Sequence, residues 1–248
     1  MRVLIVGAGE IGRWFAGVCE GWLSVTFTDV DERAAESAAT ATNAEHVLPE
    51  DITPVSVVCT AVPLRETPRV IARYAQYAET AMIDVSGSMR EPLDAMGEST
   101  DSIERISIHP LFAPENAPGN VAIVSADEGP VGATLQQRLE ARGNTTFETT
   151  PEAHDRAMET VQAKAHAALL AYALAADSVD ERFHTPISAG LTDLVSTVLD
   201  GTPRVYADIQ AQFPGAEEIA READRIAHAD PTTFESLYRQ AADRLADE

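Results

Sequence analysis

The chain has 248 residues, 45% of them hydrophobic, so it is long enough for two modest domains and too apolar for a disordered protein. No apolar run reaches the roughly 20 residues of a membrane span, and a formal net charge of −22 argues against nucleic-acid binding. The N-terminus leads directly into an apolar strand and carries no targeting signal, so we expect a cytoplasmic protein.

The acidic residues are spread along the chain rather than gathered in one tail, and Lys164 is the single lysine among 18 basic residues. Salt screens the self-repulsion of such a surface. We therefore interpret the composition as an adaptation to a salt-rich cytosol, as in halophilic microbes. An acidic surface for a basic partner is the alternative interpretation.

Strands and helices alternate through the first half of the chain. Short apolar runs, typical of buried parallel strands, occur at 2–6, 24–28, 55–62, 81–85, 105–108, 120–124 and 145–148. Helical patterns follow the first strand and recur at 32–42, 68–78 and 130–142. This alternation predicts an α/β fold whose Rossmann-type, doubly wound and mostly parallel sheet occupies 1–150.

The pattern changes near Pro151, after which apolar residues recur at helical spacing with no clear strand. One long helix is predicted over 152–177, and further helices are predicted at 187–199, 203–213, 215–228 and 231–246. We therefore expect an all-helical C-terminal domain over 151–248. Its apolar helix faces predict a homodimer formed through the C-terminal helices.

A glycine-rich turn directly follows the first strand and opens a helix, and an acidic residue ends the next strand. This context predicts a dinucleotide site with the pyrophosphate at the helix N-terminus. The carboxylate of Asp29 suits the ribose hydroxyls of NAD and repels the 2′-phosphate of NADP, although the nearby Arg33 is a counter-argument. The predicted cofactor-binding residues are Gly7, Ala8, Gly9, Glu10, Ile11, Gly12, Asp29, Ala61, Val62 and Pro63.

The two cysteines, Cys19 and Cys59, lie in separate apolar segments without metal-ligand spacing. We expect buried, reduced thiols and no metal site.

Two histidine-containing blocks are candidates for chemistry. His109 comes just after a predicted strand, in HPLFAP, where it would face the ligand crevice with a side chain suited to proton transfer. The sequence HDRAMETVQAKAH opens the long helix and contains His154, Gln162 and His166. Each block alone fits an ordinary loop or a packed core histidine as well.

Together these pieces resemble the prephenate dehydrogenase family. The matching segments occur in order: GAGEIG, a strand ending in AVP, DVSGSMREPLDAM, HPLFAP, the HDRAMETVQAKAH block and PRVYADI. The resemblance covers about residues 1–210 and implies a Rossmann domain followed by a helical dimerisation domain.

The resemblance implies that NAD accepts hydride while prephenate is oxidatively decarboxylated to 4-hydroxyphenylpyruvate. By this carry-over, His109 withdraws the proton of the ring hydroxyl. Ser86 or Ser88 would match a family serine near that hydroxyl, with the register uncertain because Gly87 lies between them. The residues implied to bind substrate are His154, Gln162 and His166.

One position departs from the family pattern. The family arginine that grips a substrate carboxylate falls at Thr197 here, in a stretch without arginine. The candidates to replace this cation are Arg204, Arg182, Lys164 or an arginine of a partner subunit. Because this arginine is missing, the chain could instead be an arogenate dehydrogenase, or a related dehydrogenase acting on another small acid. A third hypothesis is a non-catalytic NAD(H)-binding redox sensor.

Overall fold

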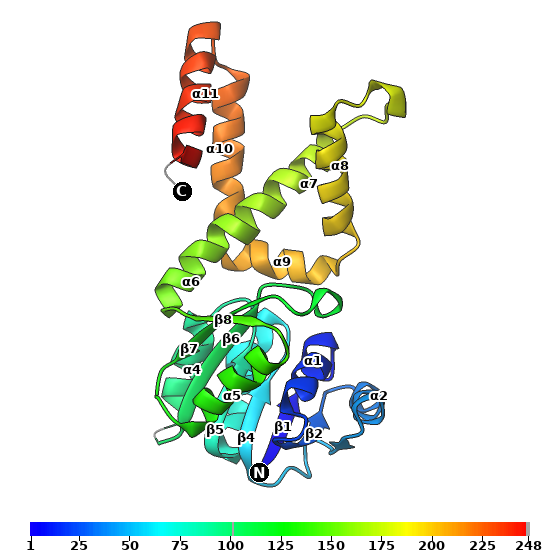
Figure 1. Ribbon diagram of the computed structural model, residues 1–248, viewed down its shortest axis with the longest axis vertical. Helices are drawn as coiled ribbons and strands as arrows, with labels where there is room; N and C mark the ends of the chain where they lie inside the picture. Colours follow the sequence, from blue (N-terminus) through cyan, green and yellow to red (C-terminus); the bar gives the residue numbers. More distant parts are fainter. Residues whose placement is uncertain (101, 247–248) are drawn as a thin grey trace. The chain divides into compact units, whose positions relative to one another are not determined.

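The computed structural model describes residues 1–100 and 102–246 and divides into two compact units, Met1–Met158 and Glu159–Glu248. The first is an α/β unit and the second is entirely helical, as Figure 1 shows. The first unit extends eight residues beyond the boundary expected at 150, because His154 and Asp155 bond to residues within it.

One eight-stranded sheet forms the centre of the N-terminal unit, in the order β3-β2-β1-β4-β5-β6-β7-β8. All neighbouring strands are parallel except β6 and β7, which confirms the mostly parallel sheet predicted from the sequence. The strands are β1 (Arg2–Val6), β2 (Ser24–Thr28), β3 (Glu45–His46), β4 (Val55–Thr60), β5 (Ala78–Val85), β6 (Glu104–Pro110), β7 (Asn120–Ser125) and β8 (Thr145–Glu148).

Helices cover both faces of this sheet (Figure 1). Alternate strand side chains point to opposite faces, so Val3 and Ile5 pack under α1, α2 and α5, whereas Leu4 and Val6 pack under α3 and α4. The helices are α1 (Glu10–Cys19), α2 (Glu32–Thr42), α3 (Thr67–Tyr74), α4 (Arg90–Ser99) and α5 (Pro130–Ala141). Because β1, β4, β5 and β6 run the same way, the loops at their carboxyl ends share one edge of the sheet.

The long helix predicted over 152–177 is present over residues 151–175, but it is not α-helical throughout. It consists of α6 (Pro151–Met158), a π-helical segment (Glu159–Lys164) and α7 (Ala165–Ala175). Extra residues in a helical turn of this kind are frequent at functional sites. The remaining helices of the C-terminal unit are α8 (Pro186–Leu199), α9 (Pro203–Gln212), α10 (Gly215–Ala227) and α11 (Pro231–Ala246).

Cys19 and Cys59 are buried and unpaired, as expected for thiols that pack as small hydrophobic groups. Burial raises the pKa of Cys19 to about 12 and raises that of Cys59 as well, so both stay protonated. Among the described residues, no helix combines the length and the hydrophobicity that a membrane crossing requires.

Candidate active site

The glycine-rich loop joins β1 to α1 and depends on the absence of side chains. Gly7 has a φ of +108°, and a Cβ there would overlap the carbonyl oxygen of Ala61. A Cβ at Gly12 would overlap the carbonyl oxygen of Gly7, so Gly12 lets α1 pack closely against the loop. A Cβ at Gly9 would meet no atom within 4 Å, which leaves open space beside the backbone. The first N–H groups of α1, which no described side chain caps, are therefore available to an anion.

Asp29 follows β2 and is bonded to this loop. Its Oδ2 accepts a hydrogen bond from the N–H of Ala8 at 2.8 Å, and its Oδ1 accepts one from the N–H of Asp31 at 2.9 Å. The half-buried carboxylate is thus fixed beside the open space, with lone pairs left for ribose hydroxyls.

The other predicted cofactor residues surround the same loop. Glu10 and Ile11 form the first turn of α1. Val62 follows β4, and its side chain would lie 3.1 Å from a Cβ at Gly7, whereas the next residue, Pro63, is exposed. The geometry therefore joins the loops after β1, β2 and β4 into one candidate cofactor site.

Asp84 ends the neighbouring strand β5 as a fully buried carboxyl group. It accepts hydrogen bonds from Thr60 at 2.8 Å and from Ser86 at 2.6 Å. Burial raises the pKa of Asp84 to about 7, although the hydrogen bonds from Ser86 and Thr60 oppose the increase. Ser86, one of the two predicted catalytic serines, is therefore held by Asp84.

Ser88, the other predicted serine, is fully buried and bonds to a different carboxylate. Its hydroxyl donates to Oδ2 of Asp155 at 3.3 Å, and the N–H groups of Met89 and Arg90 donate to the two Asp155 oxygens at 3.0 and 3.3 Å. Asp155 thus caps the N-terminus of α4, where the helix dipole favours negative charge. Burial alone would raise the pKa of Asp155, but the hydrogen bonds from His154, Met89 and Arg90 lower it overall.

His154 links this carboxylate to His109. Nδ1 of His154 lies 2.8 Å from Oδ1 of Asp155, and Nε2 of His154 lies 2.9 Å from Nδ1 of His109. The His154 side chain is only 1% exposed. Both of its ring nitrogens are therefore engaged within the N-terminal unit. The substrate-binding role expected for His154 stays a prediction.

His109 lies at the carboxyl end of β6, as predicted. Its Nε2 has no hydrogen-bond partner among the described residues, and a Cβ at Gly87 would lie 3.8 Å from it. Burial lowers the pKa of His109 to about 3, with His154 adding to this effect and Asp155 opposing it. His109 is therefore a neutral imidazole with one ring nitrogen beside a glycine, and neither serine hydroxyl bonds to it.

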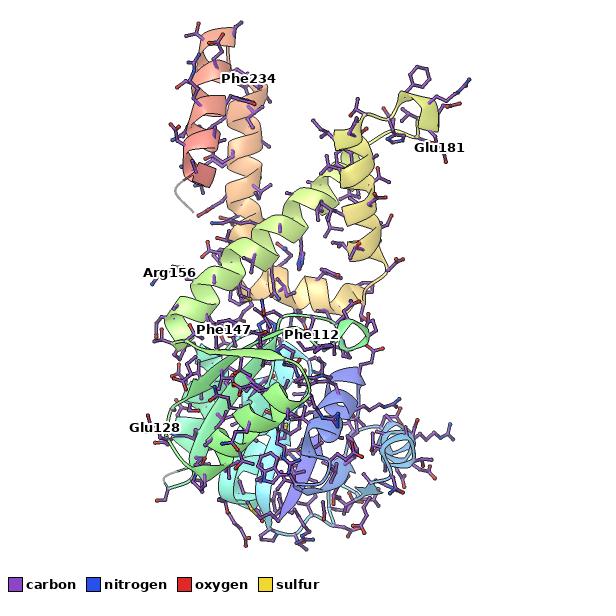
Figure 2. All side chains as sticks on the ribbon, in the orientation of Figure 1. Phe112, Glu128, Phe147, Arg156, Glu181 and Phe234 are labelled. Carbon is purple, nitrogen blue, oxygen red and sulfur yellow. The ribbon has the colours of Figure 1, made fainter. Side chains whose placement is uncertain are left out.

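The loop after His109 is anchored to the helix that follows the glycine-rich turn. Phe112, labelled in Figure 2, packs edge-on against Trp14 of α1 with ring centroids 5.8 Å apart. This contact ties the loop that follows the candidate base to the helix that begins the candidate cofactor site.

In the C-terminal unit, three buried polar atoms around the π-helical segment and α7 have no hydrogen-bond partner among the described residues. They are Oε1 of Gln162, Nδ1 of His166 and Oε1 of Gln210. The His166 ring stands edge-on to Tyr206 with centroids 4.8 Å apart, and Nε2 of Gln210 donates to the carbonyl of Ala163 at 2.8 Å. Burial lowers the pKa of His166. A buried polar atom without a partner costs about 1–3 kcal/mol, so this cluster favours a polar ligand.

Two of the candidate replacements for the family arginine, Lys164 and Arg182, form ion pairs with acidic side chains. Lys164 lies 2.6 Å from Glu218 and 3.5 Å from Glu159. Arg182, on a short turn before α8, pairs with Asp180. Thr197 is exposed on α8 and donates its hydroxyl to a carbonyl of its own helix.

Arg204 is the least tightly held of these cations. It begins α9 with its side chain 61% exposed, 3.9 Å from the buried Asp208. Of Arg204, Arg182 and Lys164, it is therefore the one most available to a carboxylate.

Sequence reasoning missed three polar residues that contact or neighbour the predicted ones. Asp155 lies within the HDRAMETVQAKAH block but was not among the predicted residues, although the adjacent His154 was a usable signal. Asp84 and Gln210 gave no signal, because an acid at a strand end and a glutamine on a helix are common surface features.

No family model matches the chain. The chain is 27% identical over 96% of its length to a 4-amino-4-deoxyprephenate dehydrogenase of Streptomyces pristinaespiralis, of which it covers 88%. It is 25% identical over 99% of its length to a probable arogenate/prephenate dehydrogenase of Methanocaldococcus jannaschii and spans 61% of that longer relative.

A solved structure shares the fold over both units. The prephenate dehydrogenase of A. aeolicus, in complex with hydroxyphenyl propionate and NAD+, matches with a TM-score of 0.70 at 16% identity, over 100% of this chain and 99% of that one. The chain is therefore similar over nearly its whole length to two dehydrogenases of the prephenate/arogenate type, and it shares the fold of a solved prephenate dehydrogenase.

Proposed function

We propose that the chain catalyses the NAD-dependent oxidative decarboxylation of prephenate to 4-hydroxyphenylpyruvate. The observation that carries this proposal is the neutral His109, whose Nε2 is without a partner at the carboxyl edge of the sheet. Ligands of open α/β sheets bind at this edge. An imidazole there with a bare nitrogen suits proton removal from a hydroxyl group.

In the proposed reaction, Nε2 of His109 accepts the proton of the hydroxyl on ring carbon 4. Bound NAD+ supplies the acceptor for the hydride that leaves the same carbon. The bond to the ring carboxylate then breaks, CO2 departs, and the bonding electrons make the ring aromatic. His109 returns its proton to the ring oxygen, so the protein neither gains nor loses a proton over the cycle.

The candidate cofactor site supports NAD rather than NADP. The space beside Gly9 and the free N–H groups of α1 suit a pyrophosphate. Asp29, Asp31 and Glu32 make the end of β2 acidic, which disfavours a 2′-phosphate. The side chain of Arg33 is exposed, and the hydrogen bond of this residue to Asp31 is made by its backbone N–H.

Gln162 and His166 are proposed to bind polar groups of the substrate, and Gln210 joins them. Their buried, unpaired atoms support a ligand that supplies hydrogen bonds. Arg204 is the proposed partner of a substrate carboxylate.

A second candidate substrate carries nitrogen in place of the ring oxygen. The 27% identical relative is a 4-amino-4-deoxyprephenate dehydrogenase, and a neutral His109 also accepts a proton from nitrogen. Arogenate is a third candidate, because the unpaired amide oxygens of Gln162 and Gln210 are acceptors suited to an amino group.

The deciding experiment compares the three substrates with the same protein. The purified chain is mixed with NAD+ or NADP+ and each substrate in molar potassium chloride, and NADH or NADPH is followed by absorbance. The proposal expects the highest kcat/KM with prephenate and NAD+, and formation of 4-hydroxyphenylpyruvate. A higher kcat/KM with either other substrate would replace prephenate in the proposal.

The His109→Asn variant tests whether His109 acts as the base. It should lose about 10²- to 10⁴-fold in kcat, the usual contribution of general-base catalysis. NAD+ binding, measured by titration calorimetry, should be unchanged, because His109 does not belong to the glycine-rich loop. A variant with wild-type kcat would exclude His109 as the base.

We further propose a homodimer formed through the C-terminal unit. α7 is apolar around its whole circumference, yet none of its residues is buried. A helix of this composition is normally buried on all sides. A second copy of the chain is the occupant that this surface supports.

A further inference from the structure

Asp155, His154 and His109 form a continuous hydrogen-bonded line within the N-terminal unit. The line begins at a carboxylate that also caps α4 and ends at the partnerless Nε2 of His109. We infer that Asp155 and His154 are positioning residues that hold His109 in the tautomer with a bare Nε2. This inference rests on the proposed function for its catalytic consequence, but not for its tautomer.

The direction of each hydrogen bond follows from Asp155. An ionised carboxylate only accepts, so Nδ1 of His154 must carry a proton. Nε2 of a neutral His154 is then an acceptor, and Nδ1 of His109 must donate to it across 2.9 Å. A neutral imidazole has a single N–H, so Nε2 of His109 keeps its lone pair.

Asp155 is well suited to fix the direction of these hydrogen bonds. Both of its oxygens accept backbone N–H groups at the start of α4, so the carboxylate cannot rotate without losing them. The same bonds lower its pKa and keep it ionised. His154 is buried between two fixed partners, so its ring cannot flip without breaking both bonds.

If these hydrogen bonds ran in the opposite direction, His109 could not act as a base. If Nε2 of His154 carried the proton, Nδ1 of His109 would have to accept it, and Nε2 of His109 would then hold the hydrogen. A donor would face the position where the proposed reaction needs an acceptor. These hydrogen bonds therefore decide whether His109 is a base, although neither Asp155 nor His154 bonds to its Nε2.

The direct test is ¹⁵N NMR of histidine-labelled protein at the assay pH without substrate. In the wild type, we expect His109 with a protonated Nδ1 and an unprotonated Nε2; the spectrum of His109→Asn identifies its signals. His154→Phe removes the acceptor, and a free imidazole favours the proton on Nε2. The His109 signals should therefore shift toward that tautomer.

Kinetics supply the second readout. His154→Phe should lower kcat by about 10²- to 10⁴-fold with little change in KM or in NAD+ affinity. His154→Gln should recover part of this loss, because an amide can donate to Asp155 and accept from His109. The matched control is His228→Gln, which alters a histidine–aspartate pair whose side chains are about three-quarters exposed. This control should match the wild type.

Two results would overturn the inference. One is a wild-type His109 with its proton on Nε2; the other is a His154→Phe protein whose His109 tautomer and kcat are both unchanged. Because the NMR measurement needs no substrate, it stands even if the proposed reaction is wrong. Retained NAD+ binding by His154→Phe shows that a loss of kcat is not a loss of fold.

Discussion

Asp84 is a carboxyl group that the fold removes from water without a cationic partner among the described residues. Burial raises its pKa to about 7, from about 3.8 in an unfolded chain. Between about pH 4 and pH 7, Asp84 is therefore protonated in the folded protein and ionised in the unfolded chain. Stability contributed by this proton is present below pH 4 and is lost as the pH rises through 7.

The Asp84→Asn variant removes this dependence while keeping the shape of the side chain. Between pH 5 and pH 8, the wild type should lose about 2–3 kcal/mol of unfolding free energy relative to the variant, at 1.36 kcal/mol per pKa unit. Urea unfolding of both proteins at the two pH values measures this difference. Equal pH dependence in the two proteins would show that Asp84 is not protonated in the fold.

At the scale of single residues, the sequence indicated His109 but not its surroundings. A histidine directly after a strand of a parallel sheet has few places to lie other than the carboxyl edge. Its partner His154 is 45 positions away, and only the folded chain brings the two rings within 2.9 Å. The expectation that His154 binds substrate remains a prediction, and nothing in the sequence indicated its contact with His109.

Elements were predicted where the apolar pattern was strong. Parallel strands such as β1 and β2 appear at their predicted residues, because a strand covered by helices needs apolar side chains on its buried faces. α4 was missed, since only Pro92, Leu93 and Met96 of its ten residues are buried and its cap comes from Asp155, far along the chain. The π-helical segment gave no sequence signal, because its residues fit an α-helix equally well.

Packing of α10 against the π-helical segment depends on Gly215. A Cβ at this position would lie 2.7 Å from the backbone nitrogen of Lys164 and 2.8 Å from Cβ of Ala163. Gly215→Ala should therefore destabilise the protein by about 1–3 kcal/mol. Urea unfolding measures this value.

The control lies in another helix of the same unit. A Cβ at Gly190, within α8, would meet no atom within 4 Å, so Gly190→Ala should stabilise the protein by about 0.5–1 kcal/mol. If the two alanine variants changed stability equally, close packing at Gly215 would not be the cause.

At the scale of the whole molecule, the apolar surface is unevenly distributed. Fourteen large hydrophobic side chains are exposed among the described residues, and eleven of them lie after Met158. Leu174 on α7 is 89% exposed, and Phe234 on α11 is 48% exposed and labelled in Figure 2. Isolated exposed side chains are ordinary, but a concentration in one unit supports an interface.

The proposed dimer predicts twice the mass of the chain in sedimentation equilibrium in molar potassium chloride. Leu174→Glu places a charge on α7 and should shift the protein toward the monomer. Val30→Glu, at an equally exposed position of the N-terminal unit, should leave the mass unchanged. A wild-type monomer under these conditions would exclude the dimer. Lowering the salt should also favour the monomer, because two chains of charge −22 repel each other less when screened.

The π-helical segment Glu159–Lys164 also sets the direction in which the side chains after it point. Successive residues of an α-helix are rotated by about 100° around its axis. A π-helical turn holds about one residue more than an α-helical turn. If the same residues formed ordinary α-helix, the side chains of α7, including His166, would therefore be rotated by about that angle. The direction of this proposed ligand-binding residue is therefore set by the local helix type as well as by its place in the sequence, and a one-residue deletion that restored ordinary α-helix would shorten the chain without rotating α7.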